Sequence, residues 1–356
     1  MLNYIKNGEK IISDEIKRVH DEGKSVVRIS GNYEISDVIK IPSHTTLILE
    51  DCRLRLADGV FSQIFTNENA LNEGKSDCDI HILGVGTAVL DGGEYNGLSE
   101  RSQNKNGLPP IWHNNFIVFN RVDTFSIEKI KCVKSRWYSM AFIASKNGTI
   151  RDIDFDGDCR RIDQKTGETV YGLVRELYPE TVVKNGDGID ICSGSHDILI
   201  ENITGFTEDD TVALGSLITD GQPRPMIKHY GVPDDLDVYN IVIRNIRVSC
   251  FCSPIRLINQ GGPKIYNVLI DGVFDASLYD ERLNHGDCGV MIGDTEPYGE
   301  RQPSTDETFN ICVKNVYSRA DTALRVCGGI KNFTYENING FDRCTDVVNL
   351  KNAVIE

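Results

Sequence analysis

The stretch that decides the fold is His196-Asp-Ile-Leu-Ile-Glu-Asn-Ile203, a short aliphatic run that ends in Asn-Ile. The same pattern returns along the chain, at 124–130, 147–153, 239–246, 266–273, 309–316 and 331–338. A shorter apolar pair follows after a gap, at Ile189/Ile191, Val212/Leu214, Ile255/Leu257, Val290/Ile292, Leu324/Val326 and Val348/Leu350. Successive copies lie one or two periods of 22 to 27 residues apart, with longer intervals where loops intrude, so the chain is a degenerate repeat.

A fixed period of short strands with Asn or Gly at the corners is typical of a solenoid, whose coils bury a continuous core by stacking. Alternation within each strand directs Ile and Val inward and polar residues outward. We therefore expect an all-β fold, a right-handed parallel β-helix of about ten coils, with corner Asn residues in the left-handed conformation and hydrogen-bonded along a ladder. Leucine-rich repeats need Leu at fixed positions and a helical segment in each repeat, and the sequence has neither.

Because a solenoid core grows linearly with length, we interpret residues 1–356 as a single β-helix domain. The segment 1–31 is expected to cap one end, where strand edges would otherwise lack partners. Its apolar residues recur at helical spacing, at Ile11, Ile12, Ile16 and Val19. The capping helix is predicted to start near Ser13-Asp14-Glu15 and to end before Gly23.

The composition of the chain indicates in which compartment the protein acts and which classes of partner it does not bind. The segment 1–31 has no apolar run long enough for a signal peptide or a membrane span. The eleven cysteines show no paired spacing apart from Cys250 and Cys252, so we interpret them as small core hydrophobes rather than as disulfides or zinc ligands. Both features favour a cytoplasmic, reducing location. The net charge of −15 argues against nucleic acid and anionic membranes as partners.

Two acidic motifs stand 23 residues apart, Asn185-Gly-Asp-Gly-Ile-Asp-Ile191 and Glu208-Asp-Asp-Thr-Val-Ala-Leu214. Aligning their strands puts Asp187 and Asp210 at one register on neighbouring coils, about 4.8 Å apart along the backbone. Asp209 comes just before, at the bend. Carboxylates this close cannot all ionise freely, so at least one pKa should rise. A proton donor beside a charged base is what cleavage of a glycosidic bond requires.

Further polar residues fall near this column. Arg256 lies two coils beyond Asp190 at the same outward position, where it could bind a sugar or hold an aspartate ionised. His229, in the intervening coil, is a candidate polar contact, and Asn185 is expected to orient the bend. Each also has a purely structural interpretation, because aspartates at bends cap turns, an outward Arg covers apolar surface, and His229 can be a loop residue. No metal or cofactor is expected.

At these residues the chain resembles family 28 of the glycoside hydrolases, the polygalacturonase family. The resemblance rests on Asn-x-Asp-Gly-Ile-Asp, the Asp-Asp bend and the Arg-bearing strand, and on Gly84-Val-Gly-Thr-Ala-Val-Leu-Asp-Gly92, similar to the family's Gly-x-Gly-x-x-x-x-Asp-Gly. It covers about half of the chain by motif, to about Asn259. It implies that Asp209 is the general acid, and that Asp187 and Asp210 activate water in an inverting single displacement.

The same resemblance exposes three departures. Arg256 matches the Arg of the family's Arg-Ile-Lys, but the position of the Lys holds Ile258. Because that Lys helps the family bind the carboxylate of galacturonate, the departure indicates another uronide or a neutral sugar. The family's Gly-His-Gly is absent, and His229 is aligned in its place. Glu208 stands where the family usually has Gly, so the chain is similar to a divergent member.

Two insertions, 156–184 and 274–288, are longer than a coil requires and are expected to overhang the cleft. Their candidate contacts are Arg160, Arg161, Tyr171, Arg175 and Tyr178 in the first, and Tyr279, Arg282 and His285 in the second. A loop that closes one end of the cleft would favour exo action on short chains. Trp137 is expected to pack in the core. For Trp112 the sequence leaves two interpretations open, core packing or an aromatic surface on which a sugar ring stacks.

Three classes of function stay open. The first is a glycoside hydrolase acting on uronide-containing or related plant-type oligosaccharides. The second is a polysaccharide lyase or epimerase on the same fold, which would need a basic residue over the acids and usually calcium. The third is a non-catalytic carbohydrate-binding β-helix protein. The expected partner is an oligosaccharide, and a homo-oligomer is possible.

Overall fold

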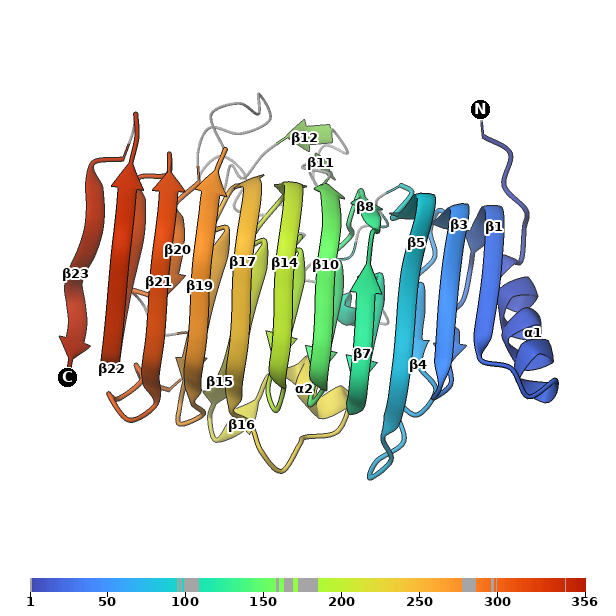
Figure 1. Cartoon of the computed structure of the whole chain (residues 1–356), viewed down its shortest axis with the longest axis horizontal. Coiled ribbons are helices and arrows are strands. Elements are labelled where there is room, and N and C mark those ends of the chain that lie inside the picture. Colours follow the sequence, from blue (N-terminus) through green and yellow to red (C-terminus); the bar gives the residue numbers. More distant parts are fainter. Residues whose placement is uncertain are drawn as a thin grey trace.

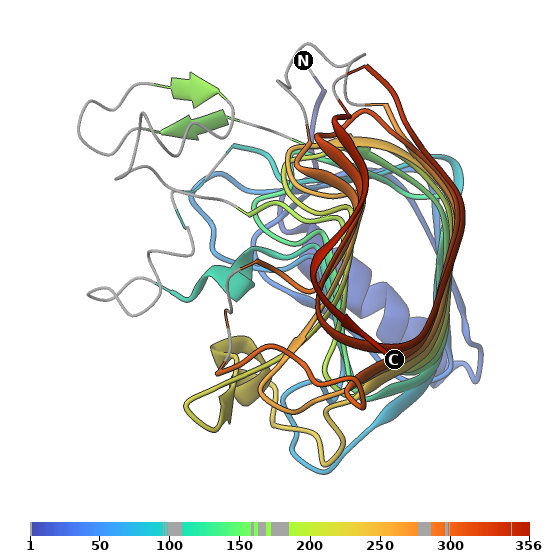
Figure 2. The same cartoon turned by 90° about the vertical axis from the view of Figure 1, so that its left-hand side faces the viewer.

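The computed structural model describes residues 2–94, 96, 98, 109–157, 160–162, 169–171, 185–276, 286–295, 298, 300–342 and 344–356. These form a right-handed parallel β-helix with one helix at its N-terminal end, as predicted (Figure 1). Viewed along its axis, successive coils superimpose and α1 lies across the far end (Figure 2).

Each coil contributes a strand to two parallel ladders. The first ladder runs through β1 (Val26–Ile35), β3 (Thr45–Leu56), β5 (Asp77–Asp91), β7 (Val122–Glu128) with β8 (Lys131–Val133), β10 (Lys146–Asp156), β14 (His196–Thr207), β17 (Val238–Cys250), β19 (Ile265–Asp275), β21 (Thr308–Ser318) and the end of β22 (Thr322–Gly340). The second runs through β2 (Ile39–Ile41), β4 (Phe65–Asn67), β6 (Ile117–Asn120), β9 (Met140–Ile143), β13 (Ile189–Cys192), β15 (Val212–Thr219), β18 (Ile255–Gln260), β20 (Cys288–Ile292), the start of β22 and β23 (Asp346–Ile355).

Several of the described elements lie outside the ladders. They are the helices α1 (Gly8–Asp21) and α2 (Pro225–His229), the 3₁₀ turn η2 (Ile111–Asn114), β16 (Gln222–Pro223), and the antiparallel pair β11 (Arg160–Ile162) and β12 (Thr169–Tyr171). No helix among the described residues is long and apolar enough to cross a membrane.

The core is built from columns of aliphatic side chains, one from each coil. Ile150 pairs in register with Ile200, Ile200 with Ile243, and Ile243 with Ile270, and none of the four is exposed. Full burial of such a side chain contributes about 1.5–3 kcal/mol, so the columns outweigh any single polar contact. The predicted inward placement of Ile and Val is confirmed.

One bend of the coil carries a column of polar side chains that we call the amide column, made of Asp197, Asn240, Asn267, Asn310 and Asn332. Each amide Nδ2 donates to the side-chain Oδ1 of the member before it, over 2.9, 2.9, 2.9 and 3.0 Å. All five have positive φ, between 49° and 56°, which Asn and Asp tolerate better than other residues with a Cβ. The predicted left-handed corners and side-chain ladder are confirmed.

The N-terminal helix was located correctly, but its start was not. It begins at Gly8, after Asn7 in the left-handed conformation, so Ser13-Asp14-Glu15 lies within the helix. Ile12, Ile16 and Val19 are buried against the first coil, whereas Ile11 is 43% exposed and faces away. The cap is also shorter than 1–31, because β1 already belongs to the first coil.

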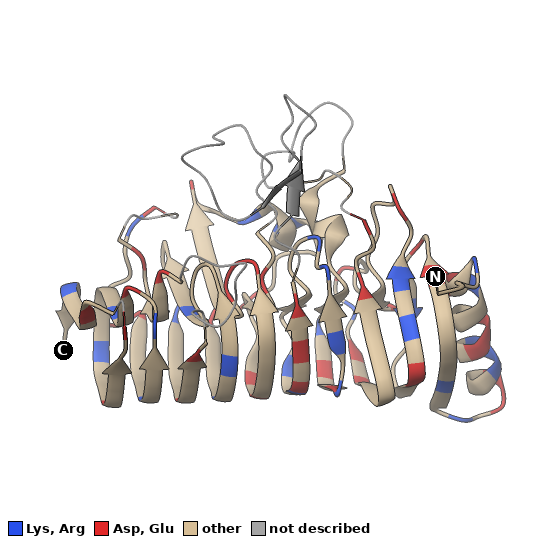
Figure 3. Ribbon diagram, turned by 90° about the horizontal axis from the view of Figure 1, so that it is seen from above, with Lys and Arg blue, Asp and Glu red and all other residues tan. Residues whose placement is uncertain are grey.

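The distribution of charged residues and the burial of the cysteines agree in part with the predictions. Acidic and basic residues are spread along the coils (Figure 3). Cys132, Cys288 and Cys327 are buried as predicted, whereas Cys192 and Cys312 are half-buried. Trp137 lies in a buried cluster outside the second ladder, and Trp112 lies there too.

Candidate active site

The two acidic motifs meet because their strands pair directly. Ile189 is in register with Val212, which sets Asp187 opposite Asp210 on the neighbouring coil, as predicted. The Gly188 amide donates to the Asp210 carbonyl over 2.9 Å at this point. A Cβ on Gly188 would lie 2.4 Å from the Thr211 carbonyl oxygen, so only glycine allows the two backbones to approach this closely.

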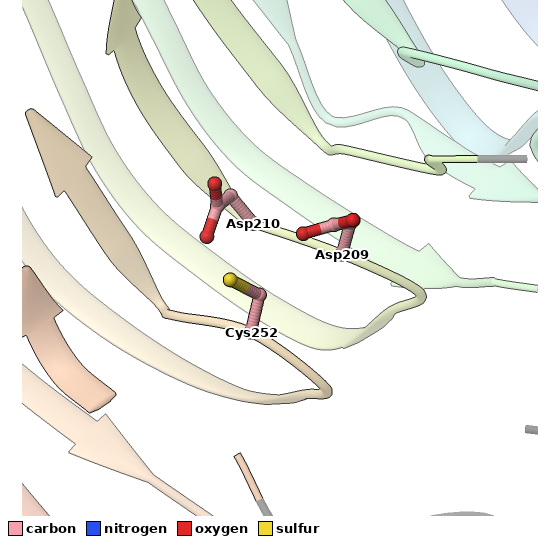
Figure 4. Close-up of side chains that lie close together, drawn as sticks. All are labelled: Asp209, Asp210 and Cys252. Carbon is pink, nitrogen blue, oxygen red and sulfur yellow. The ribbon is translucent and has the colours of Figure 1, made fainter. Parts of the chain in front are cut away.

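The acidic bend before β15 is fixed by hydroxyl groups. The Thr207 hydroxyl lies 2.8 Å from the Thr211 hydroxyl and also donates to the Asp209 carbonyl over 3.0 Å. These contacts close a turn that directs the side chains of Asp209 and Asp210 to one side. Figure 4 shows both carboxyl groups on that bend, facing the turn that carries Cys252.

The carboxyl groups are buried rather than solvated. Asp187, Asp190, Asp209 and Asp210 are each between 4% and 6% exposed. Burial raises the pKa of Asp190 well above its usual range, against the charge of Arg224 and with a contribution from Asp210. Asp187 makes a side-chain hydrogen bond with Asp190. The expectation that at least one pKa would rise is confirmed, but burial contributes more to the rise than the crowding of carboxylates from which it was predicted.

Asp210 has several partners of its own. Burial raises its pKa to about 7, while Arg256 opposes the shift and Asp209 adds to it. The Ser253 amide donates to its Oδ1 over 3.0 Å, and the Cys252 thiol makes a hydrogen bond with its side chain. At neutral pH this group is therefore close to its midpoint, where it can accept or release a proton.

Arg256 occupies the position that the sequence predicts. Asp190 pairs with Ala213 and Ala213 with Arg256, so one outward column holds all three. The Arg256 Nη1 lies 3.7 Å from Asp210 Oδ2, and its Nη2 donates to Asp294. Its Cζ is 5.4 Å from the centre of the Tyr298 ring. The guanidinium is therefore held between two carboxylates and an aromatic face.

Asp209, Asp210 and Cys252 each offer a ligand atom, and these atoms lie within 4.8 Å of one another. The donor set does not suit a cation, however. The Arg256 guanidinium already lies beside Asp210 and donates to the Cys252 sulfur, so a bound cation would face a positive charge at close range. The arrangement favours proton transfer over metal binding.

His229 and Asn185 are the two other residues that the sequence predicts to lie at the site. His229 ends α2, with its ring 5.8 Å from the rings of Trp112 and His113. Burial lowers its pKa. Asn185 is half-buried with a φ of 55°, in keeping with a bend residue. A contact of either residue with substrate stays a prediction.

Arg224 is a residue that the sequence reasoning missed. It precedes α2, is exposed, and donates through Nη1 to the Tyr138 hydroxyl over 3.3 Å. Its positive charge acts on the buried Asp190. The only sequence signal is Arg224 before Pro225, a common helix start that carries no information about what lies opposite.

The segment 222–231 forms a wall beside the acidic cluster. Met226, Ile227 and Tyr230 pack onto outward side chains of β6 and β9, such as Val118 and Ala141. Strong hydrogen bonds anchor it there, because the Tyr230 carbonyl accepts from Asn120 over 2.7 Å and from Arg121 over 2.9 Å. The segment therefore covers the coils just before β13.

The two insertions predicted to overhang the cleft are described only in part. Residues 160–162 and 169–171, which include Arg160, Arg161 and Tyr171, pair as β11 and β12 in a sheet of their own. Arg175, Tyr178, Tyr279, Arg282 and His285 lie outside the described residues. Ile258, at the family's Lys position, is 5% exposed and pairs with Gly215.

The chain is similar to one known protein family in sequence and to several solved structures in fold. The family model described as "Glycosyl hydrolases family 28" matches residues 35–222. No curated protein matches the chain in sequence. An exopolygalacturonase from Thermotoga maritima is 16% identical with a TM-score of 0.60, over 96% of this chain and 87% of that one.

Two further solved structures share the fold. A polygalacturonase from Erwinia carotovora is 16% identical with a TM-score of 0.55, over 100% of this chain and 97% of that one. The A-module of a mannuronan C-5 epimerase from Azotobacter vinelandii is 13% identical with a TM-score of 0.50, over 98% and 75%. These likenesses concern the β-helix itself.

Proposed function

Because the chain belongs to glycosyl hydrolase family 28, we propose that it hydrolyses glycosidic bonds of uronide-containing oligosaccharides by an inverting acid/base reaction. The observation that carries the proposal is the meeting of Asp187, Asp190, Asp209 and Asp210 on two adjacent coils, all buried. Burial raises the pKa of Asp190 and of Asp210, which supports a proton donor beside a charged base, as acid/base catalysis needs.

In this proposal Asp209 donates a proton to the leaving oxygen, and Asp187 and Asp210 activate the attacking water. Ligand atoms of Asp209 and Asp210 lie within 4.8 Å of one another. That is closer than the ~6.5–9.5 Å at which an inverting pair leaves room for water. We therefore assign the water chiefly to Asp187, on the preceding coil, with Asp210 in support.

Two cations support an anionic sugar. Arg256 lies beside Asp210, and the exposed Arg224 lies near Asp190. A guanidinium at the rim can bind a carboxylate in a bidentate manner, which would compensate for Ile258 in place of the family's Lys. We therefore favour a uronide over a neutral sugar.

The wall formed by 222–231 supports exo action. It packs against the outward faces of β6 and β9, immediately before the coil of Asp187 and Asp190. A substrate chain lying along the outward face would be stopped at this wall. Only a few sugar units would then extend past the acids on that side, as in an exo-acting enzyme.

The test is a panel of oligogalacturonides, rhamnogalacturonan fragments and neutral oligosaccharides, assayed with the wild type and Asp209→Asn. We expect release of single sugars or short units, and proton NMR should show inverted configuration in the first product. Asp306→Asn is the matched control, because that side chain is 82% exposed and distant in sequence. Equal turnover by Asp209→Asn and wild type would remove Asp209 from the reaction.

Other products would point elsewhere. Retained configuration would assign a nucleophile, and Asp210, which has a carboxylate oxygen within 4.8 Å of one of Asp209, would be the candidate. Unsaturated products would indicate a lyase, and altered sugar configuration without cleavage an epimerase. Binding without turnover would indicate a carbohydrate-binding protein.

A further inference from the structure

We infer that Cys252 is a positioning residue, whose thiol holds Asp210 as the carboxylate that supports the attacking water. The inference rests on the proposed hydrolase function and assigns a role within its site. Cys252 lies in the turn between β17 and β18, with its sulfur directed toward Asp210 (Figure 4) and within 4.8 Å of a carboxylate oxygen of both Asp210 and Asp209.

The first step is the direction of the thiol proton. Arg256 Nη1 donates to the Cys252 sulfur at 3.6 Å, so the sulfur acts as an acceptor on that side. The thiol hydrogen is then available for the Asp210 side chain, with which Cys252 makes a hydrogen bond. Arg256, Cys252 and Asp210 thus form a short chain of donors that ends on a carboxylate.

The second step is the charge of the thiol. Cys252 is half-buried, and its burial together with Asp210 and Asp209 raises its pKa well above the usual range. It therefore stays a neutral donor at any pH at which the enzyme would work. A serine hydroxyl could make the same contact, but alanine could not.

The third step is the difference between two adjacent aspartates. Asp210 receives the thiol, the Ser253 amide at 3.0 Å and the Arg256 charge at 3.7 Å, all of which favour its ionised form. Losing the thiol would therefore make Asp210 harder to ionise. Asp209, one residue earlier, would then compete more evenly for the negative charge.

Several other charged groups act on this pair, and a test must hold them constant. They are Asp187 and Asp190 on the preceding coil, Arg224 beside Asp190, Glu208 at the same bend, and Asp294 behind Arg256. A change confined to Cys252 leaves all of them in place.

The first experiment is the pH dependence of kcat/KM for Cys252→Ala and Cys252→Ser, on the substrate that the panel identifies. We expect Cys252→Ala to move the acidic limb upward by about half to one pH unit. Activity below the limb would fall by about three- to tenfold, with little change above it. Cys252→Ser should restore the limb, and Cys312→Ala, a half-buried cysteine on a distant coil, should leave it unchanged. An acidic limb in Cys252→Ala equal to that of wild type would overturn the inference.

The second experiment needs no turnover. The infrared S–H stretching band of Cys252 is isolated as the difference between wild type and Cys252→Ser, and is followed as the pH is raised. We expect it to shift to lower frequency as Asp210 ionises, because a carboxylate is the stronger acceptor. Asp210→Asn should abolish the shift. A band that does not move with pH contradicts the inference, whereas a moving band with no hydrolysis of any sugar contradicts the proposed function alone.

Discussion

Two columns of polar side chains are built by the same coil repeat, yet their chemistry differs. In the amide column every member is exposed, and each amide donates to the residue before it. The second column, here called the carboxylate column, consists of Asp187 and Asp210, which are buried. Stacking alone therefore does not make a site. A site forms where groups of the same charge are buried together, because they cannot neutralise one another and their pKa values shift.

The pKa directions follow from this contrast. Asp197, at the start of the amide column, has its pKa lowered, because His196 and then Asn240 donate to its carboxylate. Asp210 has its pKa raised to about 7 by burial, although Arg256 and Cys252 oppose the shift. The same residue type is thus kept charged on one bend and brought near neutrality on the other.

The largest expected effect separates the two columns by activity. We expect Asp210→Asn to lower turnover by about 10²- to 10⁴-fold, because it removes a proton acceptor from the site. Asp197→Asn should retain wild-type turnover, since it only extends the amide column. Both variants are assayed on the same oligosaccharide after their far-UV spectra are matched. Comparable losses in the two variants would mean that folding, and not chemistry, is being measured.

The second effect is the dependence of stability on pH. The folded-state pKa of Asp210 is above its ordinary value, so the folded protein binds the proton more tightly. Its contribution to the free energy of unfolding is full below about pH 4 and is lost as the pH rises through about 7. The slope is on the order of 1 kcal/mol per pH unit. Urea unfolding at pH 4, 5.5 and 7 should show a shallower decline in Asp210→Asn than in wild type.

Asp197 should give the opposite sign. Its folded-state pKa is lowered, so its contribution is present above the ordinary value and is lost as the pH falls through the folded one. Asp197→Asn should therefore change stability less at acidic pH than at pH 7. An unchanged slope in both variants would show that neither column sets the acid–base behaviour of folding.

The third effect concerns how closely the coils approach at the carboxylate column. A Cβ on Gly188 would lie 2.4 Å from the Thr211 carbonyl oxygen, so Gly188→Ala should lower the free energy of unfolding by about 1–3 kcal/mol. Gly215, one coil further along on β15, has nothing within 4 Å of the same position. Gly215→Ala should therefore be close to neutral in urea unfolding. Equal losses in the two variants would argue against close backbone approach as the cause.

The contrast also explains what the sequence could predict. Period and phase are properties of the chain, so the register of Asp187 with Asp210, the place of Arg256 and the left-handed Asn residues were all predictable. The capping helix began earlier than expected, because Asn7 starts it without a side-chain cap. Capping rules that look for side-chain acceptors therefore placed the start too late.

Site residues that lie in irregular segments were not predicted from the sequence. Arg224, Asp294 and Tyr298 reach the site from turns whose path the repeat does not fix. Cys252 was interpreted as a small hydrophobe, because a sequence does not show that its sulfur faces carboxylates. A periodic pattern determines which coil a residue occupies. It does not determine how far a loop returns across the outward face.

The smallest effect tests the amide column by itself. Asn267 donates to Asn240 and accepts from Asn310, both over 2.9 Å, with a φ of 55°. Asn267→Ala loses these bonds and strains the left-handed backbone, which should lower the free energy of unfolding by about 1–2 kcal/mol. Asn267→Gly loses the same bonds without strain and should cost less. Turnover of the folded fraction should equal that of wild type in both variants, because this bend lies apart from the acids. A loss of turnover that exceeds the loss of folded protein would mean that the two columns are coupled through the coil.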